Sequence, residues 1–153
     1  MKTQGLRCRE RPNETPGPPS SARLIVVDDH EMLRESLRSL LECDHNLRIV
    51  DEAKDGQEAI EMCRLQRPDL VLMDVRMPKM NGLEATRTIK EELPTTKVLL
   101  MSAYEEPVLV SDAVRAGADG YVLKLSLVQG LLDAISGVLG GDSQYPCISE
   151  NRI

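Results

Sequence analysis

Two adjacent carboxylates follow directly on a run of apolar residues near the start of the sequence. Leu24 to Val27 is unbroken by any polar residue, and Asp28 and Asp29 come next. One interpretation is helix capping, because aspartate is a common N-cap residue and a helical pattern follows. A cap needs only one carboxylate, however, and two like charges at the end of a buried strand repel each other and are costly to desolvate. The other interpretation is a site that holds a cation, and this stretch alone does not decide between them.

Three further polar residues, Asp74, Ser102 and Lys124, also stand at the ends of apolar runs. Each alone has an ordinary explanation as a turn residue, a loop cap or a solvated side chain. Parallel strands of one sheet, however, bring their carboxyl ends to a shared edge, where such sheets place their sites. Three carboxylates with one lysine leave excess negative charge, which Mg²⁺ would relieve. Asp74 would then be a nucleophile toward phosphorus, with Lys124 and Ser102 stabilising the phosphoryl oxygens.

The hydrophobic pattern predicts five strands that alternate with five helices. The strands are short continuous apolar runs, which is typical of a parallel sheet covered by helices on both faces. The fold class is therefore α/β, with a doubly wound parallel sheet. The predicted strands are 23–27, 47–52, 69–74, 97–102 and 120–124. The predicted helices are 31–42, 56–66, 82–92, 107–116 and 126–139.

The two ends of the sequence lack this pattern. Residues 1–21 are rich in proline and mildly basic, which predicts a disordered tail. Residues 140–153 are expected to be a C-terminal tail or a remnant linker, so the folded domain is predicted over 22–139. The sequence shows neither a membrane span nor a secretory signal, and we expect a cytoplasmic protein without membrane contacts.

The composition restricts the function further. A net charge of −6 argues against nonspecific binding to nucleic acid or an anionic membrane. The four cysteines are widely scattered without a pair at zinc-ligand spacing, which argues against a zinc site. His30 adjoins the acidic pair, but Mg²⁺ prefers oxygen ligands, so we expect His30 to be a solvated residue of the first helical turn and no ligand.

Four motifs together resemble the receiver domain of two-component response regulators, in the CheY-like superfamily. They are "LIVVDDHEML", "PDLVLMDVRMPKMNGLEA", "VLLMSAY" and "GADGYVLK", and they occur in the order and spacing of that family. The resemblance covers Ala22 to about Leu139. It implies the flavodoxin-like fold, with five parallel strands in the order 2-1-3-4-5 and five helices.

The resemblance also implies a phosphorylation site. It places the phosphoacceptor on Asp74, with Ser102 and Lys124 as the other catalytic residues. It implies phosphate transfer from a sensor histidine kinase or a phosphotransfer protein, with Mg²⁺ as the cofactor. The implied metal ligands are Asp28, Asp29, Asp74 and the backbone carbonyl of Arg76.

A conformational switch is the third implication of the resemblance. Ser102 and Tyr121 correspond to the switch pair, and the side chains of Arg76 and Tyr104 to positions that modulate self-dephosphorylation. The surface formed by helix 107–116, strand 120–124 and helix 126–139 would then contact a downstream effector. Dimerisation on phosphorylation is common among such proteins. We expect a signalling switch that catalyses only its own phosphorylation and dephosphorylation, and no enzyme in the wider sense.

The sequence departs from the receiver-domain pattern at two places. Many receivers have a proline in a cis bond after the lysine, whereas Leu125 follows Lys124 here; a cis bond before a non-proline residue costs ~3–4 kcal/mol. The conformation of this bond is therefore open, and Leu125 alters the expected signalling surface. Second, "MSAYEEPVLVSDAVRAGADGYVLK" resembles receivers that precede a LuxR-type helix-turn-helix, yet no recognition helix follows. We expect no direct DNA binding by this chain, which is either a stand-alone adaptor or the truncated receiver of a transcriptional regulator.

Two other functions fit less well. A flavodoxin-like cofactor binder needs a Ser-, Thr- or Gly-rich turn after the first strand to hold a phosphate, and carboxylates stand there instead. A metal-dependent phosphatase with an aspartyl intermediate typically has the pattern DxDx[TV], and Arg76 occupies the position of its second aspartate.

Overall fold

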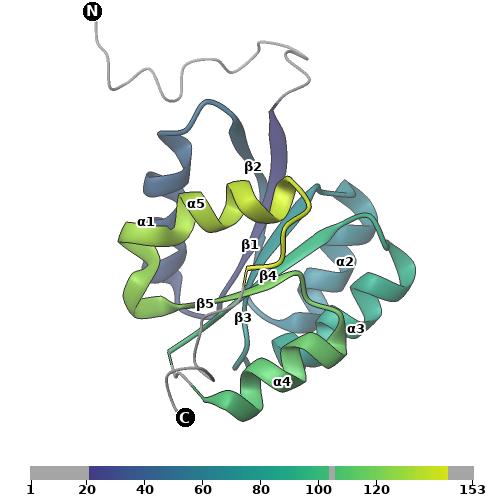
Figure 1. Cartoon of the computed structure of the whole chain (residues 1–153). Helices are drawn as coiled ribbons and strands as arrows, with labels where there is room; N and C mark the ends of the chain where they lie inside the picture. The colour runs from purple at the N-terminus through teal and green to yellow at the C-terminus, as the bar shows by residue number, and fades with distance from the viewer. Residues whose placement is uncertain (1–20, 104–105, 145–153) are drawn as a thin grey trace, which may run out of the picture.

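A five-stranded parallel sheet forms the centre of the fold in the computed structural model (Figure 1). The structure describes residues 21–103 and 106–144, with residues 126–129 described by their backbone alone. The strand order is β2-β1-β3-β4-β5, which confirms the predicted flavodoxin-like fold class. The strands are β1 (Ala22–Val27), β2 (Leu47–Ala53), β3 (Leu70–Asp74), β4 (Lys97–Ser102) and β5 (Gly120–Leu123). The helices are α1 (Glu31–Glu42), α2 (Gly56–Gln66), α3 (Gly82–Glu92), α4 (Pro107–Ala116) and α5 (Leu127–Leu139).

Local sequence signals explain the starts of α2 and α3. The side chain of Asp55 accepts a hydrogen bond from the backbone N–H of Glu58 at the start of α2, and Asn81 does the same for Glu84 at the start of α3. Lys124 lies outside β5, contrary to the prediction, because the backbone tightens there into the short 3₁₀ helix η2 (Lys124–Ser126).

The helices divide into two layers, one on each face of the sheet. Helices α2, α3 and α4 cover one face, and α1 and α5 cover the other (Figure 1). Successive residues of β1 alternate between the two cores: Ile25 and Val27 belong to the first, Leu24 and Val26 to the second. All four are at most 1% exposed, which explains why the strand is apolar throughout.

The strand register brings the carboxyl ends of β1, β3 and β4 together. Val27 pairs with Met73, and Asp74 pairs with Met101 one position before the end of β4. The backbone N–H of Asp28 donates to the carbonyl oxygen of Ala53 at the end of β2 (3.1 Å). The side chains that follow these strands therefore emerge at one edge of the sheet.

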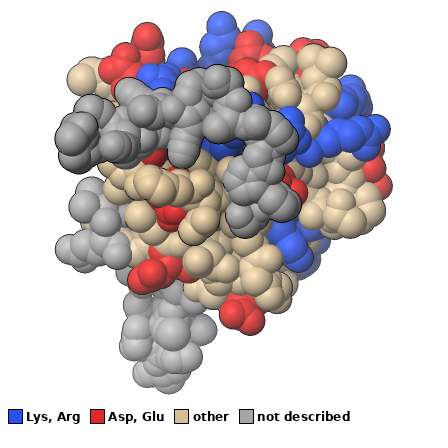
Figure 2. Space-filling model, turned by 90° about the horizontal axis from the view of Figure 1, so that it is seen from above, with Lys and Arg blue, Asp and Glu red and all other residues tan. Residues whose placement is uncertain are grey.

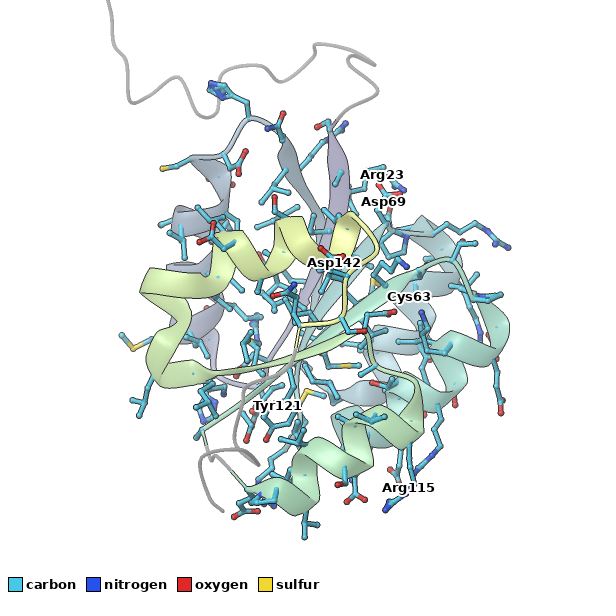
Figure 3. All side chains as sticks on the ribbon, in the orientation of Figure 1. Arg23, Cys63, Asp69, Arg115, Tyr121 and Asp142 are labelled. Carbon is cyan, nitrogen blue, oxygen red and sulfur yellow. The ribbon has the colours of Figure 1, made fainter. Side chains whose placement is uncertain are left out.

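The opposite edge of the sheet is formed by the starts of the strands. There the backbone N–H of Arg23 donates to the side chain of Asp69 (2.8 Å), and Figure 3 shows these two residues side by side. Figure 2 shows the molecule from above the view of Figure 1, and acidic and basic side chains are interspersed over the surface visible there.

After α5 the chain returns to the sheet, where Gln144 forms a bridge with Gly120. Within the described residues, no helix is long and apolar enough to span a membrane.

We predict that Gly82→Ala destabilises the protein by about 1–3 kcal/mol, as overpacking typically does. Gly82 begins α3 against the strand that ends in Asp74, and an added Cβ would overlap the Asp74 carbonyl oxygen. Gly130→Ala in α5 is the matched control, because a Cβ there has no neighbour within 4 Å. The control should stabilise by about 0.5–1 kcal/mol through helix propensity. Urea unfolding measures both, and a Gly82→Ala variant as stable as the wild type would contradict the close packing.

Candidate functional site

Lys124 lies between two buried carboxylates at the carboxyl edge of the sheet. Its Nζ atom is 2.9 Å from Oδ2 of Asp28 and 3.2 Å from Oδ2 of Asp74. Asp28 is 0% exposed and Asp74 is 4% exposed. Asp74 ends β3, while Asp28 and Lys124 directly follow β1 and β5, so the parallel strands bring the three residues to one edge of the sheet.

The loop between β1 and α1 carries the second carboxylate of the acidic pair. Oδ1 of Asp28 accepts a hydrogen bond from the backbone N–H of His30 (2.8 Å), which turns the chain toward α1. The capping interpretation of the acidic pair is wrong, because His30 occupies the N-cap position of α1 and makes no capping hydrogen bond with its side chain. The imidazole Nδ1 of His30 lies 3.0 Å from Oδ1 of Asp28 and 3.4 Å from Oδ1 of Asp29. His30 is exposed, as expected, but its contact with both carboxylates was not predicted.

The acidic cluster has the donor set that a hard divalent cation requires. Asp28, Asp29, His30 and Asp74 each offer a ligand atom, and these atoms lie within 4.8 Å of one another. Oδ2 of Asp28 is completely buried, and among the described residues it has the Lys124 ion pair but no hydrogen bond of good geometry. Three carboxylates face one ammonium group, so the residues fit the predicted Mg²⁺. The roles of the Arg76 carbonyl as a ligand and of His30 as a non-ligand stay predictions.

The electrostatic surroundings shift the pKa values of Asp74 and Lys124 upward. Burial raises the pKa of Asp74, the negative charge of Asp28 raises it further, and Lys124 opposes both. Burial by itself lowers the pKa of Lys124, but the short contact with Asp28 and the negative charges of Asp74 and Asp28 outweigh it, and the net pKa is raised. The ammonium form of Lys124 is therefore favoured. The ionised form of Asp74 is disfavoured, because the positive charge of Lys124 does not fully offset burial and the charge of Asp28.

The predicted switch pair meets beside this cluster. Ser102 ends β4 and Tyr121 lies in β5, and both are 1% exposed. Burial raises the pKa of Tyr121, and a hydrogen bond with the Ser102 side chain opposes that shift. Figure 3 shows Tyr121 among the side chains between the sheet and α4. Any movement of the Ser102 side chain would therefore change its hydrogen bond with Tyr121.

The remaining predicted positions surround the site. The side chain of Arg76 is exposed and lies 3.7 Å from a carboxylate oxygen of Glu106, just before α4. Tyr104 lies outside the described residues, so its modulating role stays a prediction. No peptide bond among the described residues is cis, so the Lys124–Leu125 bond is trans. Leu125 is 90% exposed beside the site.

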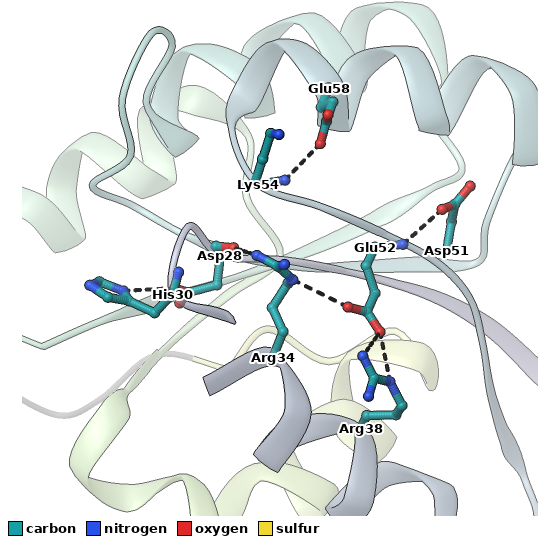
Figure 4. Close-up of polar contacts among 8 residues, drawn as sticks. All are labelled: Asp28, His30, Arg34, Arg38, Asp51, Glu52, Lys54 and Glu58. Atoms are coloured by element: carbon teal, nitrogen blue, oxygen red, sulfur yellow. Dashed lines mark hydrogen bonds and ion pairs between the residues drawn. The ribbon is translucent and has the colours of Figure 1, made fainter. Parts of the chain in front are cut away.

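Two charged residues next to the site were missed by the sequence reasoning. Arg34 in α1 donates to the carbonyl oxygen of Asp28 and to the carboxylate of Glu52 in β2 (Figure 4). The sequence held part of the signal: Glu52 stands in a predicted strand, and a charged side chain that is partly buried there is favoured by a partner of opposite charge. The sequence does not show which of the charged residues of α1 supplies that partner.

Comparison with known proteins agrees with this geometry. Residues 24–136 match the family of response regulator receiver domains. The chain belongs to this family, which confirms the resemblance seen in the sequence.

Individual relatives indicate the subfamily. The chain is 34% identical to the transcriptional regulatory protein DegU of Brevibacillus brevis, over 86% of this chain and 56% of DegU. A LuxR-family two-component response regulator from an Aurantimonas strain has 37% identity and a TM-score of 0.79, over 82% of this chain and 89% of that one. The receiver domain of the response regulator NarL from Mycobacterium tuberculosis has 37% identity and a TM-score of 0.76, over 80% of this chain and 99% of that one. The chain thus spans about half the length of DegU.

We predict that Asp74→Asn stabilises the protein at pH 7, because it removes a buried negative charge that Lys124 does not fully compensate. A pKa that is raised in the folded state means that protonation of Asp74 favours folding. The wild type should therefore approach the stability of the variant as the pH falls through the raised pKa of Asp74 toward the ordinary aspartate pKa of 3.8. Urea unfolding at several pH values measures this difference.

Asp112→Asn in α4 is the control for the same chemical change, since Asp112 pairs with Arg115 away from the cluster. It should show no gain in stability at pH 7. Equal stability of Asp74→Asn and wild type at pH 7, or a difference that grows in acid, would contradict the electrostatic account.

Proposed function

We propose that this chain is a phosphorylatable receiver in a two-component phosphorelay. Asp74 accepts a phosphoryl group, with Mg²⁺, from a sensor histidine kinase or a phosphotransfer protein. The observation that carries the proposal is the position of Asp74: it is buried at the end of β3, 3.2 Å from the Lys124 ammonium and within the cluster of Asp28 and Asp29.

The residues supply the groups that phosphoryl transfer needs. A carboxylate oxygen of Asp74 attacks phosphorus, the P–N bond of the donor phosphohistidine breaks, and the bonding electrons leave with the imidazole. Lys124 stabilises one phosphoryl oxygen by charge, and the Ser102 hydroxyl donates a hydrogen bond to another. A Mg²⁺ ion held by Asp28, Asp29, Asp74 and the Arg76 carbonyl would neutralise the remaining charge. In this proposal the protein catalyses its own phosphorylation and dephosphorylation and acts on no other substrate.

The signal leaves the site through the switch pair. When the phosphoryl group draws Ser102 toward itself, the hydrogen bond between Ser102 and Tyr121 is lost or rearranged. Tyr121 packs in the core that contains Leu109 and Ala113 of α4. The surface formed by α4, β5 and α5 then changes shape, and a downstream effector recognises the change. Leu125 and Val108 expose apolar area at this surface.

We also propose that the phosphorylated receiver controls transcription. The relatives are transcriptional regulators, and the chain spans 56% of the length of DegU. This favours the receiver of a DNA-binding, LuxR-type regulator over a stand-alone adaptor. The DNA contacts would then be made by a separate domain, in the cytoplasm, with dimerisation on phosphorylation bringing two copies together.

We predict that a small phosphodonor such as acetyl phosphate, with Mg²⁺, adds one phosphoryl group of ~80 Da to the wild-type chain. Electrospray mass spectrometry of the intact protein measures the gain. Asp74→Asn should abolish it, because the amide cannot act as the nucleophile. Asp112→Asn, which makes the same chemical change in α4, should keep the gain.

An unchanged mass of the wild type in saturating Mg²⁺ would contradict the proposal. So would an equal gain by the Asp74→Asn variant, which would place the phosphoryl group on another residue.

A further inference from the structure

One arginine of α1 links the acidic cluster to the neighbouring strand. Nη1 of Arg34 donates to the carbonyl oxygen of Asp28 (2.6 Å), and Nε of the same guanidinium donates to Oε1 of Glu52 in β2 (3.2 Å; Figure 4). We propose that Arg34 is a positioning residue for the cation site, which holds the carboxylates of Asp28 and Asp29 where they bind Mg²⁺. This inference rests on the proposed function of the cluster.

The positioning role depends on the hydrogen bond from Arg34 to the carbonyl oxygen of Asp28. It belongs to the peptide unit between Asp28 and Asp29, and that unit is planar and rigid. The N–H of Asp28 is already held by Ala53 of β2 (3.1 Å). Fixing the carbonyl through Arg34 therefore fixes the orientation of the next Cα, which carries the Asp29 side chain. A cation site requires its ligands to be held to within ~0.5 Å, and this hydrogen bond contributes that control.

The guanidinium is itself held in place. Oε1 of Glu52 accepts from Arg34, while Oε2 of Glu52 accepts from Nε of Arg38 (2.8 Å) and lies 2.6 Å from its Nη2. The side chain of Arg34 is 18% exposed, so solvent has little access to it. A planar guanidinium presents donors along two of its edges, and so it can bridge the loop and β2 together; an ammonium group on a flexible stem cannot do this in the same way.

A positioning role and a purely electrostatic role of Arg34 predict opposite effects on Mg²⁺ affinity when Arg34 is replaced. A cation next to a cation site repels the metal, so on electrostatic grounds its removal should tighten Mg²⁺ binding. The positioning role predicts the opposite sign. Loss of a partner that orients metal ligands typically costs 10–100-fold in metal affinity.

The test compares Arg34→Met with Arg38→Met. Both substitutions remove one positive charge from α1 and one partner of Glu52, but only Arg34 contacts Asp28. Isothermal titration calorimetry with MgCl₂ should give a dissociation constant at least ~10-fold higher for Arg34→Met. The value for Arg38→Met should change by ~2-fold at most, because Oε1 of Glu52 can still accept from Arg34 in that variant. An unchanged or lower dissociation constant for Arg34→Met would overturn the proposal.

A second readout separates positioning from a general structural defect. The Mg²⁺ concentration for half-maximal phosphorylation by acetyl phosphate should rise ~10-fold in Arg34→Met, while the rate at saturating Mg²⁺ stays within ~3-fold. If the substitution only lowered the fraction of folded protein, the maximal rate would fall and the Mg²⁺ concentration for half-maximal phosphorylation would stay unchanged. Glu52→Gln keeps an oxygen acceptor for Arg34, so it should retain most of the Mg²⁺ affinity, whereas Glu52→Leu should not.

If Arg34→Met does not fold by circular dichroism, Arg34→Lys provides the same comparison with the charge retained, and it should still weaken Mg²⁺ binding several-fold. The two proposals fail separately. A wild type that takes up neither Mg²⁺ nor phosphate would refute the proposed function. A wild type that takes up both, with an Arg34→Met variant that matches it, would refute the role of Arg34 alone.

Discussion

Lys124 stands between the buried carboxylates of Asp28 and Asp74 and balances only part of the negative charge that Asp28, Asp29 and Asp74 bring together. The rest of the site depends on this imbalance. Burial together with the charge of Asp28 raises the pKa of Asp74, and the contacts with Asp28 and Asp74 favour the ammonium form of Lys124. The excess negative charge is what a divalent cation would neutralise. In the proposed function, the same electrostatics that disfavour the ionised form of Asp74 would prepare the cluster to take up Mg²⁺ and a phosphoryl group.

The fold supports this cluster by burying a large apolar sheet behind it. Strands β1, β3 and β4 carry side chains of two cores, one beneath α2, α3 and α4 and the other beneath α1 and α5. Those cores fix the strand ends, which keeps the backbone positions of Asp28 and Asp74 close together. The contacts of Arg34 with Asp28 and of Ser102 with Tyr121 connect the cluster to α1 and to β5. In the proposed function, a change of charge at Asp74 would reach both layers of helices through these contacts.

The sequence predicted those features that depend on local patterns or on sheet topology. The bounds of α1 and α3 followed from helical periodicity, which is a local pattern. The proximity of Asp28, Asp74 and Lys124 followed from strand order, since parallel strands end at one edge. Contacts made by long side chains between elements could not be predicted in this way. The reach of Arg34 to Glu52, and the approach of the His30 imidazole to both aspartates, depend on how α1 is placed against β2 and on side-chain conformations that periodicity does not encode.

The most direct test of the account is a crystal structure of the wild-type protein soaked in MnCl₂, with the manganese located by its anomalous scattering. The account predicts one strong peak among the carboxylates of Asp28, Asp29 and Asp74, in direct contact with at least one of their oxygen atoms. A structure without manganese at these carboxylates in millimolar MnCl₂, or with the three side chains pointing away from one another, would contradict it.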